Sequence, residues 1–145
     1  MDFKENRETI LILDDVSQQL APLGKFLESF DFDVKFFDNG HSALQYLHRD
    51  GAELILLGMP DMDSTEFCEI VKKDDNLKEI SVVFLAARND EEALVDCFCK
   101  GAADYISKPY SLKEVLARIC VLLKHDLKCY LKTVDLKSEP SPTQL

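Results

Sequence analysis

The stretch 53-ELILLGMP-60 holds an apolar run of strand length that ends abruptly at Gly58. Runs of similar length recur on both sides of it, at 9-TILIL-13, 32-FDVKFF-37, 80-ISVVFLA-86 and 103-ADYIS-107. Most of them run without polar interruption, which is typical of parallel strands that are buried on both faces. Segments with the apolar spacing of helices lie between and after these runs. This alternation predicts an α/β fold, a doubly wound parallel sheet with helices on both faces.

The predicted helix ends are marked unevenly. The last helix opens with the capping box 111-SLKE-114, in which Ser111 bonds the amide of Glu114 and the Glu114 side chain reaches back. The first helix is less regular because Pro22 and Gly24 lie inside it, so we expect this helix to begin late or to kink.

Apolar residues continue after the last predicted helix, at Leu123, Leu127, Leu131 and Val134. This pattern predicts an extended C-terminal helix, which either frays or forms an exposed seam that pairs with another chain. We therefore expect a folded domain over residues 8–123, an extension of the last helix or a linker over 124–137, and a disordered tail over 138–145.

The composition bounds the class of protein. The 145 residues suit one domain, and the net charge of −10 argues against direct binding to nucleic acid or to an anionic membrane. The apolar runs are too short to span a bilayer and the first residues do not resemble a signal peptide, so we expect a cytoplasmic protein without a membrane partner. We expect reduced thiols at all five cysteines, which are Cys68, Cys97, Cys99, Cys120 and Cys129.

Ligands of open parallel sheets bind beyond the carboxyl ends of the strands, so the residues that follow each strand are the candidates for a site. Each is an ordinary cap or turn residue when taken alone. In chain order they are Asp14 and Asp15, Gly58, Ala86 and Ala87, and Lys108 and Pro109.

Four segments together resemble the receiver domain of bacterial two-component response regulators. They are 10-ILILDD-15, 59-MPDMDS-64, 82-VVFLAAR-88 and 100-KGAADYISKPYSLKEVLARI-119. The resemblance covers roughly residues 8–123. It implies a flavodoxin-like, CheY-like fold with the strand order 2-1-3-4-5 and five helices. It also implies phosphorylation of an aspartate at the end of the third strand, with Mg²⁺ as cofactor.

The resemblance assigns roles to the residues that follow the strands. Asp14 and Asp15 match the metal-binding acids, Lys108 matches the lysine that neutralises the phosphoryl group, and Tyr105 matches the switch aromatic. The phosphoacceptor position, however, holds Gly58, and sliding the gap in the shortened loop brings Leu57 or Leu56 there, never an acid. The position of the family's Ser or Thr holds Ala86.

The missing groups predict a degenerate receiver, or pseudo-receiver. Glycine has no nucleophile and alanine has no hydroxyl, while two acids without the third bind Mg²⁺ weakly at best. We therefore expect no catalytic residue, no cofactor other than weakly held Mg²⁺, and an ion pair from Lys108 to Asp14 or Asp15.

The expected function is protein interaction without enzymatic activity. The resemblance implies a histidine kinase, another regulator or an output domain as partner. It also implies a homodimer through the fourth helix, fifth strand and fifth helix, or through the C-terminal helix. On that face we expect the contacts Val95, Cys99, Tyr105 and Tyr110, although Val95 and Cys99 could equally cover the edge of the core.

Two alternatives keep a chemical role for the chain. Asp61 or Asp63 could act as a substitute phosphoacceptor, although both lie downstream of Pro60 and Asp63 resembles a helix cap. A flavin-phosphate binder on the same scaffold is disfavoured, because the Asp14-Asp15 turn would repel phosphate.

Overall fold

The computed structural model describes residues 7–14, 20–58, 62–86 and 91–125. Five strands and five helices alternate in these residues. The strands are β1 (Thr9–Leu13), β2 (Asp33–Phe37), β3 (Leu54–Leu57), β4 (Ser81–Ala86) and β5 (Asp104–Ser107). The helices are α1 (Ala21–Glu28), α2 (Gly40–Asp50), α3 (Met62–Lys73), α4 (Glu91–Cys99) and α5 (Leu112–Leu122). None of these helices has the length and apolar content that crossing a membrane requires.

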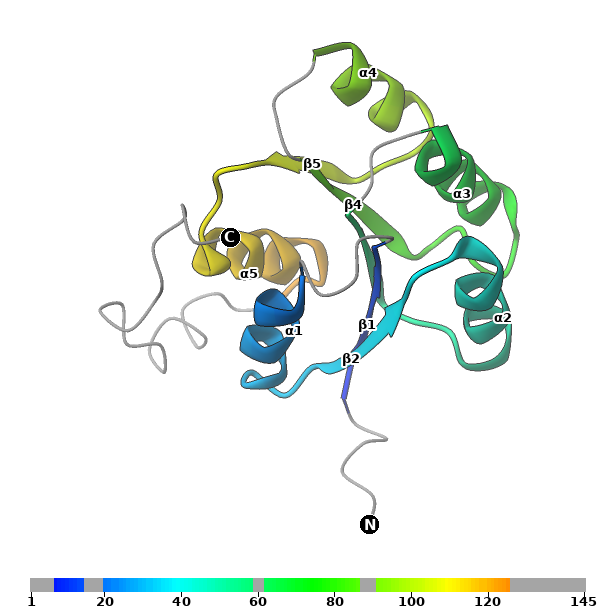
Figure 1. Ribbon diagram of the computed structural model, residues 1–145. Coiled ribbons are helices and arrows are strands. Elements are labelled where there is room, and N and C mark those ends of the chain that lie inside the picture. Colours follow the sequence, from blue (N-terminus) through cyan, green and yellow to red (C-terminus); the bar gives the residue numbers. More distant parts are fainter. Residues whose placement is uncertain (1–6, 15–19, 59–61, 87–90, 126–145) are drawn as a thin grey trace.

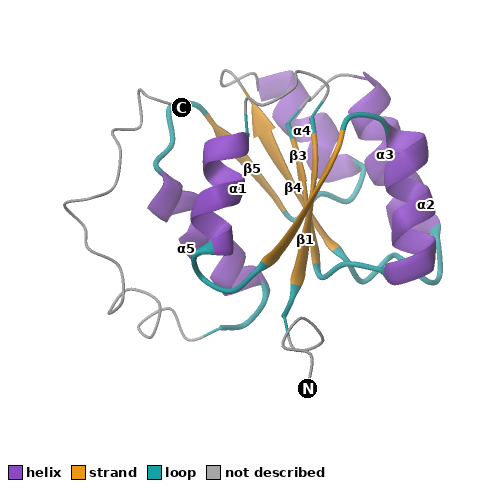
Figure 2. Cartoon of the chain, turned by 60° about the horizontal axis from the view of Figure 1, so that its bottom comes forward, coloured by secondary structure: helices purple, strands orange, loops and turns teal. Residues whose placement is uncertain are grey.

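The strands form one parallel sheet in the order β2-β1-β3-β4-β5. Ile10 of β1 lies beside Val34 of β2 on one side and beside Leu54 of β3 on the other. Helices α1 and α5 cover one face, and α2, α3 and α4 cover the other (Figure 1, Figure 2). The predicted flavodoxin-like, doubly wound sheet of five strands with five helices is confirmed.

Each face of the sheet has its own apolar core, because successive side chains of a strand point to opposite faces. Ile10 and Ile12 join the cluster under α1 and α5, whereas Leu11 and Leu13 join the cluster under α2, α3 and α4. These four side chains are at most 1% exposed. Burial of one such side chain contributes roughly 1.5–3 kcal/mol, so β1 is anchored to the apolar cores on both faces of the sheet.

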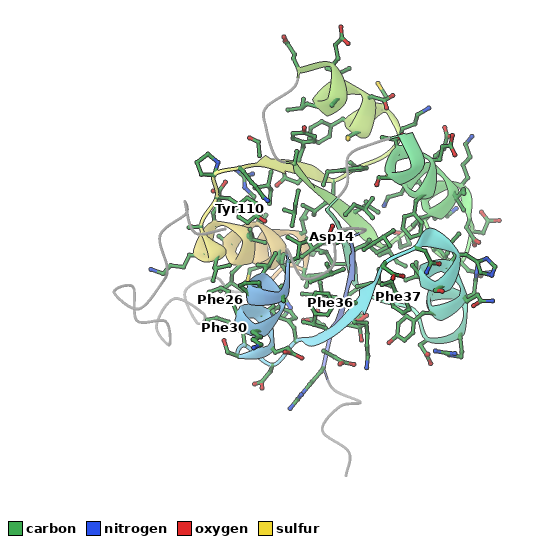
Figure 3. The ribbon with its side chains drawn as sticks, viewed as in Figure 1. Asp14, Phe26, Phe30, Phe36, Phe37 and Tyr110 are labelled. Carbon is green, nitrogen blue, oxygen red and sulfur yellow. The ribbon has the colours of Figure 1, made fainter. Side chains whose placement is uncertain are left out.

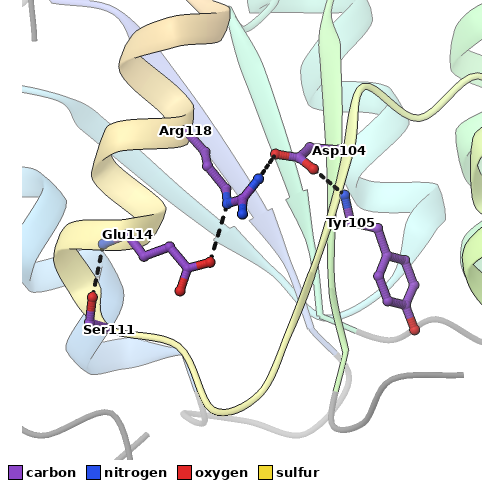
Figure 4. Close-up of polar contacts among 5 residues, drawn as sticks. All are labelled: Asp104, Tyr105, Ser111, Glu114 and Arg118. Carbon is purple, nitrogen blue, oxygen red and sulfur yellow. Dashed lines mark hydrogen bonds and ion pairs between the residues drawn. The ribbon is translucent and has the colours of Figure 1, made fainter.

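Two of the helix starts follow their sequence signals. Ser111 accepts a hydrogen bond from the Glu114 amide at 3.0 Å, which confirms half of the capping box. The Glu114 carboxylate does not reach back in this way, because it accepts a hydrogen bond from Arg118 Nε (Figure 4). Helix α1 begins late, at Ala21, so Pro22 falls in the first turn, where its missing amide hydrogen breaks no helical bond.

The end of α5 corrects the prediction of an extended C-terminal helix. The helix ends at Leu122, and Lys124 has a positive φ of 62°, which an unbroken helix does not allow. The His125 amide then donates to the Cys120 carbonyl at 2.8 Å, and the His125 ring pairs with Glu8 and lies against Phe32. These contacts turn the chain back toward the start of the sheet, and residues 126–145 lie outside the described part.

Candidate functional site

The residues that follow the strands do meet at one edge of the sheet. The hydrogen-bonding pattern of the sheet extends past the strand ends, because the Asp14 amide donates to the Phe37 carbonyl at 3.0 Å. The Gly58 amide likewise donates to Leu13, and the Lys108 amide to Ala86, each at 2.9 Å. The sheet therefore brings together the ends of β1, β3, β4 and β5, as the sequence pattern requires. Asp15 lies outside the described residues.

The position at the end of β3 is crowded by its neighbours. A Cβ atom built on Gly58 would lie 3.0 Å from Leu20 Cδ1, 3.2 Å from Asp14 Cγ and 3.3 Å from Asp14 Oδ1. Leu20 is 5% exposed and belongs to the core cluster under α1 and α5. The sequence did not predict this contact of Leu20, since no local pattern relates residue 20 to the end of β3.

Asp14 is a buried acid beside a buried phenol. Asp14 is 8% exposed and Tyr110 is 1% exposed. The pKa of Tyr110 is raised to about 12, chiefly by burial and also by the negative charge of Asp14. The expectation that Tyr110 lies on an interaction surface is wrong in this conformation, because its ring packs in the cluster between α1 and α5.

The expected ion pair of Lys108 can be checked for one of its two partners. Among the ion pairs of the described residues, none joins Lys108 to Asp14, so the prediction now depends on Asp15. The side chain is only partly buried, and an ammonium group that water can reach gains little from such a pair. The alternative partner, Asp15, lies outside the described residues.

Ala86 and Tyr105 lie in the other core cluster. Ala86 is 1% exposed and Tyr105 is 8% exposed, and both pack under α2, α3 and α4. Tyr105 is therefore also largely removed from the surface, contrary to its expected role as a contact. Beside it, Asp104 accepts a hydrogen bond from the Tyr105 amide at 2.8 Å and pairs with Arg118 of α5 at 3.0 Å (Figure 4). This pair ties β5 to α5.

The described residues do not fit a magnesium site. Asp14 supplies one carboxylate, Gly58 has no side chain, and a methyl group of Leu20 lies against the remaining space. Within the described ranges no three His, Cys, Asp or Glu side chains come together as ligands. Mg²⁺ needs a near-octahedral set of oxygens, of which the described residues supply the carboxylate of Asp14, while Asp15 lies outside the described residues.

Of the two expected substitute acceptors, the structure describes the backbone of Asp63 alone. Asp63 follows Met62, the first residue of α3, and so lies inside the first turn of the helix instead of capping it. Asp61 lies outside the described residues.

The exposed face of α4 carries apolar side chains. Val95 is 52% exposed and Cys99 is also exposed, so neither merely covers the edge of the core. Phe98, which the sequence analysis did not select, is 42% exposed. The three residues have the spacing of one helical face, and we call them the α4 stripe.

The cysteines divide into buried and exposed thiols. Burial raises the pKa of Cys68 and of Cys120 to about 11 and that of Cys97 to about 12, whereas Cys99 is exposed. All four are free thiols, and Cys129 lies outside the described part.

Comparison with known proteins gives a consistent result. A family model described as the response regulator receiver domain matches residues 10–120. The sensory transduction protein RegX3 of Mycolicibacterium smegmatis is 32% identical over 118 residues, which are 80% of this chain and 50% of that protein. Histidine kinase P4 of Formosa agariphila is 31% identical over 136 residues, 92% of this chain and 10% of the kinase. The chain thus spans about half the length of the first relative and less of the second.

Solved structures agree with this match. A putative response regulator from Chloroflexus aurantiacus superposes with a TM-score of 0.76 at 26% identity, covering 82% of this chain and 99% of that one. The chemotaxis response regulator CheY4 of Vibrio cholerae, at 19% identity, shares the fold with a TM-score of 0.72, covering 80% and 98% of the two chains. The sheet order, the matched family model and these relatives lead to one conclusion: the chain belongs to the response regulator receiver domain family of two-component signalling.

Proposed function

We propose that this chain is a degenerate receiver, which binds protein partners without being phosphorylated on an aspartate. The observation that carries the proposal is the end of β3, where Gly58 offers no side chain and Leu20 Cδ1 lies 3.0 Å from the position of a Cβ atom. This position therefore supplies no carboxylate oxygen that could accept a phosphoryl group, and it leaves no open space for a larger side chain.

The chemistry of phosphoryl transfer supports the proposal. Transfer to a carboxylate needs an in-line nucleophile and groups that neutralise the charge on the phosphoryl oxygens. Glycine supplies no nucleophile, and the buried methyl group of Ala86 cannot donate a hydrogen bond to a phosphoryl group. On this proposal Mg²⁺ is held weakly at best, because the third carboxylate is missing, and charge neutralisation is weakened with it. The acids Asp14 and Asp15 and the cation Lys108 are, on this proposal, remnants of a phosphorylation site.

Protein interaction remains as the working activity. Receiver domains are generally non-enzymatic signalling modules that interact with histidine kinases and output domains. For this chain we propose a histidine kinase, another regulator or an output domain as partner, in the cytoplasm. The domain would span residues 8–123, with a linker over 124–137 and a disordered tail over 138–145. The α4 stripe supports docking or homodimer formation through α4, β5 and α5, because it leaves apolar area exposed to water.

One alternative keeps phosphorylation. In it, Asp61 or Asp63 takes over as acceptor. The argument against this alternative is geometric, because displacement of the attacking oxygen by an ångström or so already degrades in-line attack.

The test is the intact mass of the protein after incubation with acetyl phosphate and Mg²⁺, beside an ordinary receiver as positive control. We expect no added phosphoryl group on this chain while the control is labelled. A Mg²⁺-dependent adduct would overturn the proposal. Loss of that adduct in Asp61→Asn or Asp63→Asn, but not in Glu66→Gln on the exposed side of α3, would establish the alternative.

A further inference from the structure

A cavity of about 570 Å³ lies at the same edge of the sheet, next to β2 and between the starts of α1 and α2. We call it the β2 cavity. Its size falls in the range of small-molecule sites, which are about 300–1,000 Å³. Its lining includes Asp14, Ala21, Phe36, Phe37, Asp38 and Ser42.

Two aromatic side chains form the apolar walls of the β2 cavity. Successive residues of β2 point to opposite faces of the sheet, so Phe36 lies toward α1 and Phe37 toward α2 (Figure 3). A Cβ atom on Gly24 would lie only 2.4 Å from Phe36 Cζ, so the ring lies directly against the α1 backbone. Phe36 nevertheless stays 49% exposed. Phe37 packs on Tyr46 of α2, with ring centroids 5.4 Å apart.

The polar part of the lining is acidic. Asp14 contributes a carboxylate that is 8% exposed, and Asp38 contributes an exposed one. Asn39 holds Asp38 in place, since its Nδ2 donates to Asp38 Oδ1 at 2.9 Å. The described lining contains no lysine, arginine or histidine, and the whole chain carries a net charge of −10. The field in this cavity therefore favours a cation.

Other classes of ligand fit less well. The start of α2 would attract an anion, but the Asn39 side chain already caps it by accepting from the Ser42 amide at 2.8 Å, and two carboxylates line the same cavity. A neutral apolar ligand would displace water from the exposed Asp38 carboxylate without replacing its hydrogen bonds, which costs free energy.

We propose that the β2 cavity binds a small organic cation, with an ammonium or guanidinium group on an apolar stem. The charged group would lie between Asp14 and Asp38 and near the face of Phe36, where an aromatic ring attracts a cation. The stem would pack on the exposed ring of Phe36, on the face of the sheet that also carries Asp14. This site does not depend on whether the chain is phosphorylated, so its test is separate from that of the proposed function.

The test is a titration of the nitrogen-15 labelled chain with benzylammonium at neutral pH in EDTA, followed by amide chemical shifts. The isosteric neutral probe is benzyl alcohol. We expect shifts centred on Phe37, Asp38 and Ser42, and binding of benzyl alcohol at least about fivefold weaker. Asp38→Asn and Phe36→Leu should each weaken benzylammonium binding by about two- to fivefold. Glu28→Gln, an exposed acid at the end of α1, should leave it unchanged.

Three results would overturn the proposal. They are equal binding of the alcohol, unchanged binding in Asp38→Asn, and no saturable shifts at tens of millimolar amine. A basic side chain of a protein has the same chemistry as the free cation. Binding of an acetylated phenylalanyl-lysine peptide without binding of benzylammonium would therefore also refute a small-molecule site.

Discussion

Restoring an acid at the end of β3, by Gly58→Asp, should destabilise the protein. An ideal Cβ at this position lies 3.3 Å from Asp14 Oδ1 and 3.0 Å from Leu20 Cδ1. At about 4 Å two like charges repel by about 4 kcal/mol at an effective dielectric constant of 20. Part of that energy is relieved by protonation or by rotation of one carboxylate, so we expect a net loss of about 1–3 kcal/mol at neutral pH.

The dependence on pH separates charge from crowding. Repulsion raises the folded-state pKa of the two carboxyls above the unfolded value of about 3.9. The loss of stability should therefore grow as the pH rises through that raised pKa and should fade below the unfolded pKa. Gly58→Asn is the matched control, because it crowds Leu20 without adding charge and should show no such dependence. Urea unfolding at acidic and at neutral pH measures both variants.

Two outcomes would refute this reasoning. Equal stabilities of the Asp and Asn variants at neutral pH would mean that Asp14 does not face the end of β3. Robust, Mg²⁺-dependent labelling of Gly58→Asp by acetyl phosphate would mean that the crowded position still allows in-line attack. We expect no efficient labelling, because the new carboxylate would share its space with Leu20.

Three further predictions concern Gly101, Tyr110 and Cys99. Gly101→Ala should lower the free energy of unfolding by about 1–3 kcal/mol in urea, because φ is 105° there and the new Cβ would lie 2.7 Å from Lys72 Cγ; an unchanged midpoint would contradict this. The Tyr110 pKa of about 12 exceeds the ordinary value of 10.0, so the free energy of unfolding should fall as the pH rises through that interval. Tyr110→Phe should make this fall smaller in alkaline unfolding curves without abolishing it, because the buried thiols of Cys68, Cys97 and Cys120 also have raised pKa values. Iodoacetamide at mildly alkaline pH should alkylate the exposed Cys99 long before Cys97, whose pKa is about 12. Peptide mass spectrometry measures the order, and alkylation of Cys97 before Cys99 would contradict the prediction.

The sheet was predictable from sequence because β1, β3 and β4 are nearly continuous apolar runs. Such runs have one stable arrangement when helical segments alternate with them, so the positions after the strands also follow. This is why Asp14, Gly58, Ala86 and Lys108 could be assigned to one edge before any coordinates. The strand order came from the resemblance to receivers, since periodicity alone does not order parallel strands.

The missed features depend on contacts between distant residues. Leu20 reaches the end of β3 only after α1 has packed on the sheet, and no local pattern encodes that approach. Tyr110 could have pointed outward, but the space between α1 and α5 buries its ring. The apolar residues after α5 suggested a longer helix, whereas contacts of His125 with Glu8 and Phe32 favour a turn at Lys124.

The position of β1 inside the sheet, between β2 and β3, has a consequence for the order of folding. β1 is the first strand to be synthesised, yet Ile10 pairs with Val34 on one side and with Leu54 on the other. During translation the strand therefore lacks its second neighbour until β3 has left the ribosome. Closing such long loops slows the pairing of strands. For that interval an apolar strand that the finished sheet buries on both faces is exposed, which makes this stage of synthesis prone to aggregation.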